Sequence, residues 1–132
     1  MDETLDAIKK FHGHLGPYVV LGYRMGLIAN DKLGNDPFYK NVIVYTGTTP
    51  PISCLVDGIQ LSSGCTIGKG NIKIINDKDA VAEFSNKSNE KLKIKLKDDI
   101  KNEIDTTVTE ENIVSYSQNI WKKNDEDLFE IL

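Results

Sequence analysis

Phe11-His12-Gly13-His14-Leu15-Gly16-Pro17 is the stretch from which the fold can be worked out in both directions, and it holds both histidines of the chain. Apolar residues before it recur at helical spacing and predict a helix over residues 2–11, which Gly13 ends. Gly16-Pro17 is typical of a helix start. We expect this second helix to run to about residue 33, with Gly34 as its C-cap residue.

Two glycines inside the second expected helix indicate close packing. Gly22 and Gly26 lie four residues apart and therefore share one helical face. Glycine in a helix interior costs about 1 kcal/mol relative to alanine. The pair therefore predicts tight packing, with another backbone close to this face, or access to a site.

The composition is that of a folded domain. The 132 residues are 39% hydrophobic and 27% charged, with a net charge of -4, which favours one domain over residues 1–132. This acidic balance gives no support for nucleic-acid binding, which uses a basic face. No apolar run approaches about 18 residues, so no membrane span is expected, and the charged N-terminus lacks the apolar core of a signal peptide. We expect a cytoplasmic protein, in which two cysteines are more often free thiols, ligands or catalytic groups than a disulfide.

Beyond the second helix, the pattern predicts a mixture of strands and helices. Residues 41–46 form a β-branched run that predicts a strand, and the proline-containing loop after it leads to a helix expected over residues 52–62. Residues 91–96 alternate between lysine and apolar side chains, as in an antiparallel strand with one solvated face. The other expected elements are strands at 72–75 and 80–85, a helix at 98–105, a helix capped by Thr109, and a tail from residue 124 that forms a short helix or docks on a partner.

The chemically distinctive residues all lie in the first half of the chain. They are His12, His14, Cys54 and Cys65. Imidazole and thiolate are the usual zinc ligands and also suit iron, nickel or copper, so these four residues are candidates for one shared metal site. Three alternatives stay open: a cysteine nucleophile activated by a histidine, a redox pair of the two cysteines, and buried structural cysteines with ordinary loop histidines.

Three further residues are candidates for binding a cofactor or ligand. Lys69 lies in a glycine-rich loop, residues 64–70, whose backbone N–H groups are suited to an anion. The loop lacks the spacing of a Walker A motif, which argues against a nucleotide triphosphatase. Asp57 follows Cys54 by three residues on a helix and is placed to orient a ligand, and Arg24 is a candidate for a carboxylate or phosphate. For each, an ordinary solvated side chain is the alternative.

Four blocks in this order resemble the FmdE/FwdE family of formylmethanofuran dehydrogenase proteins. They are Phe11–His14, Gly-Tyr-Arg-Met-Gly at 22–26, Cys-Leu-Val-Asp-Gly-Ile-Gln at 54–60, and Ser-Gly-Cys-Thr-Ile-Gly-Lys-Gly-Asn at 63–71. The resemblance covers about residues 7–75. It implies an α+β fold of the FwdE/GAPDH-domain-like type, with an antiparallel sheet flanked by helices, often as a homodimer.

The resemblance also implies a metal, usually zinc, bound by histidine and cysteine from these blocks. Carried over by position, His14, Cys54 and Cys65 are the expected ligands, with His12 next. Many members read His-x-Cys-Pro, whereas this chain has Gly16 at that cysteine, and the C-terminal cysteine-rich zinc ribbon of many members is absent.

We therefore expect a zinc-binding or other transition-metal-binding protein of this family. Its expected role is accessory to, or ligand-binding in, molybdenum- or tungsten-pterin or one-carbon metabolism of methanogenic type. An anionic or pterin-like small molecule is the expected ligand. The alternative is a metal- or thiol-dependent enzyme with an unknown small-molecule substrate.

Overall fold

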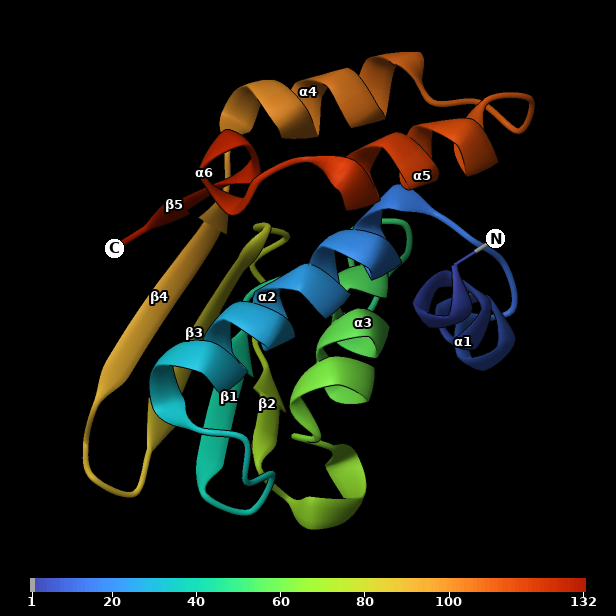
Figure 1. The fold of residues 1–132 in the computed structure, drawn as a ribbon. Helices are drawn as coiled ribbons and strands as arrows, with labels where there is room; N and C mark the ends of the chain where they lie inside the picture. The colour runs from blue at the N-terminus through green and yellow to red at the C-terminus, as the bar shows by residue number, and fades with distance from the viewer. Residues whose placement is uncertain (1) are drawn as a thin grey trace.

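The computed structural model describes residues 2–132 and shows helices packed on one five-stranded sheet (Figure 1). The helices are α1 (Glu3–His12), α2 (Pro17–Leu33), α3 (Cys54–Ser63), the short 3-10 helix η1 (Ile67–Lys69), α4 (Asp98–Thr107), α5 (Ile113–Lys122) and α6 (Asp125–Leu128). The strands are β1 (Lys40–Val44), β2 (Ile72–Ile74), β3 (Val81–Asn86), β4 (Lys91–Leu96) and β5 (Phe129–Ile131). The predicted α+β class is confirmed.

The sheet has the strand order β2-β1-β3-β4-β5. Three of its four pairings are antiparallel, as the resemblance implied, but β1 and β2 are parallel, so the sheet is mixed. The parallel pair follows from the connection, because α3 carries the chain from the end of β1 back to the start of β2. The tail, expected as a short helix or a docking segment, forms α6 and then the edge strand β5.

One face of the sheet is covered by α2 and α3, which lie side by side (Figure 1). Gly22 and Gly58 are at their crossing. A methyl group on Gly22 would overlap the carbonyl oxygen of Leu55, and one on Gly58 would overlap the carbonyl oxygen of Val19. The close backbone approach that the glycine spacing predicted is therefore confirmed.

The ends of the helices show where the local sequence decides the structure. Pro17 is the first residue of α2, and the N–H of Gly34 caps it by donating to Asn30, as predicted. The helix expected to be capped by Thr109 instead begins at Ile113. The side chain of Asn112 explains the shift, because it accepts from the N–H of Thr109 and donates to the carbonyl of Thr107, which closes a turn before the helix.

In Figure 1, α4 and α5 run across one end of the helical layer, and α1 lies beside α3. Arg24 of α2 secures α5: its guanidinium donates to the carbonyls of Ile120, Trp121 and Lys123 and pairs with Asp125. Among residues 2–132, no helix combines the length and the hydropathy that crossing a bilayer requires.

Candidate functional site

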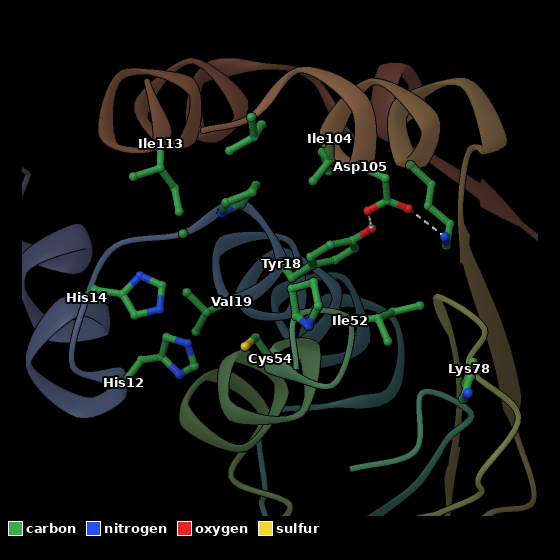
Figure 2. Close-up of a pocket in the computed structure, with 15 residues that line it drawn as sticks. His12, His14, Tyr18, Val19, Ile52, Cys54, Lys78, Ile104, Asp105 and Ile113 are labelled. Atoms are coloured by element: carbon green, nitrogen blue, oxygen red, sulfur yellow. Dashed lines mark hydrogen bonds and ion pairs between the residues drawn. The ribbon is translucent and has the colours of Figure 1, made fainter. Parts of the chain in front are cut away.

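A pocket of about 590 Å³ lies where the α1–α2 connection, the start of α3 and the α4–α5 pair meet (Figure 2). Its walls are mostly apolar, and a few polar side chains are placed at its two ends. Small-molecule sites have this size and character. The pocket is therefore the candidate site.

The first polar group is the histidine pair. His12 is the last residue of α1, and Gly13 reverses the chain with φ of 103°, a left-handed conformation that favours glycine. As a result, the His12 and His14 rings come together, with centroids 4.9 Å apart. The break at Gly13 expected from the sequence is what brings the two rings to one pocket.

Asp57 of α3 orients one of these rings. Its Oδ2 lies 2.6 Å from Nδ1 of His12. Because an ionised carboxylate only accepts hydrogen bonds, the proton of the neutral ring is on Nδ1, and Nε2 keeps a free lone pair. This carboxylate–histidine arrangement is the one that fixes metal-binding histidines in many proteins.

Cys54 is the first residue of α3 and lines the same pocket. Figure 2 shows its sulfur on the side that faces the histidine rings. Burial raises the pKa of the Cys54 thiol, and the nearby Asp57 carboxylate raises it further. Without an added cation, the thiol is therefore protonated at neutral pH.

Cys65 does not join these residues. It follows the C-terminal end of α3, is 0% exposed, and donates its N–H to the hydroxyl of Ser63. A ten-residue helix separates it from Cys54, a length of about 15 Å, and Cys65 does not line the pocket. The predicted convergence of four ligands on one site does not occur, because the two cysteines belong to opposite ends of α3.

Two predicted ligand-binding residues also lie elsewhere. Lys69 closes η1, where its ammonium lies 5.7 Å from the ring centre of Phe38 and 3.4 Å from the hydroxyl of Thr66. The guanidinium of Arg24 donates its hydrogen bonds to the end of α5 and to Asp125. Neither residue lines the pocket.

The far end of the pocket holds polar residues that the sequence reasoning missed. Tyr18 donates from its hydroxyl to Asp105 over 2.7 Å, and the other oxygen of Asp105 lies 2.7 Å from the ammonium of Lys101. Lys78, from the turn between β2 and β3, completes this end. Lys101 and Asp105 are four residues apart on α4, which is a local signal, but no local spacing indicates that Tyr18 and Lys78 join them.

The protonation of this end is settled by its surroundings. Burial raises the pKa of Tyr18, and so does the hydrogen bond to Asp105, so the hydroxyl stays a neutral donor. Burial opposes ionisation of Asp105, but the bonds from Lys101 and Tyr18 outweigh it, and the pKa of Asp105 lies below its ordinary value. Asp105 is therefore a carboxylate at neutral pH.

The histidine–cysteine end is not a preformed metal centre. Within residues 2–132, no group of three or more His, Cys, Asp or Glu side chains is placed to hold an ion. His12, His14 and Cys54 share the pocket without converging on one point.

Comparison with known proteins identifies the architecture. The family model described as FmdE, Molybdenum formylmethanofuran dehydrogenase operon, matches residues 11–130. The crystal structure of a tungsten formylmethanofuran dehydrogenase FmdE-like protein from Syntrophus aciditrophicus superposes with a TM-score of 0.69 at 20% identity, covering 98% of this chain and 69% of that one.

A curated protein from Archaeoglobus fulgidus, described as a probable S-adenosyl-L-methionine-binding protein, is 38% identical over 69 residues. The match covers 48% of this chain but 18% of that protein. The chain therefore spans less than a fifth of this curated relative.

Proposed function

The chain belongs to the FmdE family, and from that premise we propose that it is a metal-binding accessory protein that holds Zn²⁺ with His12, His14 and Cys54. The observation that carries the proposal is the meeting of both histidines and one cysteine in a single pocket. The adjoining apolar space would hold a small molecule beside these three residues. The role in formylmethanofuran dehydrogenase-related one-carbon metabolism rests on the family alone.

The residues present suit zinc. Nitrogen and sulfur donors are those that zinc prefers, and three protein ligands leave a fourth position for water or a ligand. Asp57 leaves Nε2 of His12 free to bind. A bound divalent cation would act as a Lewis acid toward a ligand in the pocket, and its charge would favour the thiolate of Cys54.

Cobalt substitution tests the proposal, because Co²⁺ bound by a thiolate absorbs visible and near-ultraviolet light whereas Zn²⁺ does not. Metal-free protein titrated with Co²⁺ should develop a sulfur-to-cobalt band and lose it when Zn²⁺ is added. Cys54→Ser should abolish the band, and His14→Ala should weaken binding by about 10-fold or more, since each ligand contributes to the site.

Cys65→Ser is the matched control, because Cys65 lies outside the pocket and should leave the cobalt band unchanged. A band that survives Cys54→Ser and disappears in Cys65→Ser would overturn the ligand assignment. Complete absence of a band in the parent protein, with thiols verified as reduced, would overturn metal binding here.

The thiol-enzyme alternative fits less well. A cysteine nucleophile needs a lowered pKa, whereas burial and Asp57 raise the pKa of Cys54. The hydrogen bond between His12 and Asp57 leaves Nε2 of His12 free, so it does not separate the two functions, and the raised pKa of the thiol carries the distinction. The raised pKa favours a thiol that ionises only beside a cation.

A second candidate function is binding of S-adenosyl-L-methionine, favoured by the 38% identity to the Archaeoglobus fulgidus protein. The pocket volume of about 590 Å³ is ample for a ligand of that class. Isothermal titration of metal-free and Zn²⁺-loaded protein with this compound tests it. No heat of binding in either form would remove the candidate.

A further inference from the structure

The two ends of the pocket differ in chemistry. Figure 2 shows His12 and His14 at one end and Lys78 at the other, with Tyr18 and Ile52 between them. Nitrogen and sulfur side chains therefore line one end, and the lysines Lys78 and Lys101 line the other. A ligand that fills the pocket meets both.

The charges that line the pocket are unequal. Lys78 and Lys101 supply its two ammonium groups, and Asp105 supplies its one carboxylate. Asp105 is paired with Lys101, whereas Lys78 has no ion-pair partner within 4.0 Å among residues 2–132. The unbalanced charge at this end is therefore positive and belongs to Lys78.

A smaller hollow adjoins this end and shares Lys101. Its lining adds two positive charges, Lys93 and Lys95, and two negative charges, Asp79 and Asp98. Lys95 and Asp98 are 3.5 Å apart and offset each other. Asp77 and Asp79 flank Lys78 in the chain, and of the two only Asp79 lines a hollow. The positive surplus at this end is therefore small and confined to the Lys78 ammonium.

Between the ends, the walls are apolar, with Val19 and Ile52 from below and Ile104 and Ile113 from α4 and α5. Such walls bind an apolar body by removing it from water, at roughly 25 cal/mol for each Å² buried. They also lower the local dielectric, which strengthens an ion pair at the pocket end.

We propose that the ligand of this pocket is an elongated molecule with an apolar body and an anionic head, a carboxylate or a phosphate, held by Lys78 with help from Lys101. Its opposite end reaches the histidines and Cys54. The inference rests on the proposed function, because it concerns the same pocket, and it assigns anion recognition to Lys78 instead of Lys69. Tyr18 and Asp105 act as positioning residues, since they hold Lys101 in place.

Two fluorescent probes with one body test the head group. Anilinonaphthalene sulfonate carries an anion, and N-phenyl-naphthylamine is its neutral counterpart. In metal-free protein, the charged probe should bind about 5-fold more tightly than the neutral one, the strength of a partly exposed ion pair. The preference should shrink as salt is added.

Lys78→Gln should remove this preference, and Lys78→Arg should keep it. Lys91→Gln is the matched control: Lys91 is an exposed β4 lysine that lines neither hollow, so its loss should change nothing. Displacement of the charged probe by naphthoate or by naphthyl phosphate then shows whether the head is a carboxylate or a phosphate.

Equal affinity for the two probes in the parent protein would overturn the inference. So would a preference that survives Lys78→Gln, because it would place the probe on another surface. The cobalt titration is run on the same variants. Cobalt binding without a Lys78-dependent probe preference would support metal binding and refute the anionic ligand. A Lys78-dependent preference without cobalt binding would support the anionic ligand and refute metal binding.

Discussion

The two ends of α3 carry the same residue type in different settings. Cys54 begins the helix beside His12 and Asp57, on a pocket open to solvent. Cys65 follows the other end, fully buried, next to the hydroxyl of Ser63. Burial raises the pKa of both thiols, so the pKa alone does not separate them.

The two ends of α3 differ in the residues that surround each cysteine. At the buried end, the ammonium of Lys40 donates to the carbonyls of Gly34 and Asp36, which closes the turn after α2. Burial lowers the pKa of Lys40, and all its visible partners are backbone groups. At the pocket end, the nitrogen and sulfur atoms that we propose as metal ligands remain available for binding. One end of α3 completes the core, and the other presents a site.

The largest effect on stability is expected from a substitution that separates α3 from α2. Gly58→Ala places a methyl group against the backbone of Val19 and Tyr23, neither of which can move without shifting α2. Overpacking usually costs about 1–3 kcal/mol; against fixed backbone we expect a loss of about 3 kcal/mol or more in the free energy of unfolding, measured by urea denaturation.

Gly68→Ala is the control, because a methyl group there meets nothing within 4 Å. Its free energy of unfolding should stay within about 0.5 kcal/mol of the parent value. Gly58→Ala with parental stability would mean that α2 and α3 are not in close backbone contact. The division between a core end and a pocket end of α3 would then lose its basis.

The next largest effect is expected in the alkylation rates of the two cysteines. In metal-free folded protein, iodoacetamide should alkylate Cys54 at least about 100-fold faster than Cys65, because a fully buried thiol reacts only through local opening. Peptide mass spectrometry after timed quenching measures both rates. The Cys54 rate should rise with pH, since its raised pKa leaves little thiolate at neutral pH. Equal rates in folded protein would refute the assignment of the two ends.

Local sequence predicted the elements because their signals are local. Pro17 and Gly34 bound α2, and the alternation at 91–96 matches β4. The position of Cys65 could not be read in the same way, since residues in different family blocks need not share a site. Only the length of α3 separates Cys65 from Cys54.

The lysine end of the pocket was missed for a different reason. Tyr18 and Asp105 are 87 residues apart and meet because α4 folds over the start of α2. Arg24 gave the opposite error: its charge indicated a ligand, but its guanidinium serves the carbonyls at the end of α5. In both cases the tertiary fold, not the local pattern, decides the partner.

The smallest effect on stability is expected at the α4 side of the pocket. A side-chain hydrogen bond holds this side, whereas close backbone packing holds α2 against α3. Tyr18→Phe removes the donor to Asp105, whose side chain is 38% exposed. Because a carboxylate this exposed is screened by solvent, we expect a loss of no more than about 1 kcal/mol at neutral pH.

The pH dependence identifies the partner. The pKa of Asp105 is lower in the folded protein than in the unfolded chain, so the bond's contribution is complete above the unfolded value of about 3.9 and is lost as pH falls through the folded value. Urea denaturation of both proteins across this range should show the difference between parent and Tyr18→Phe shrinking toward acid pH. A difference that stays constant would mean that the tyrosine hydroxyl stabilises this wall through some group other than the Asp105 carboxylate.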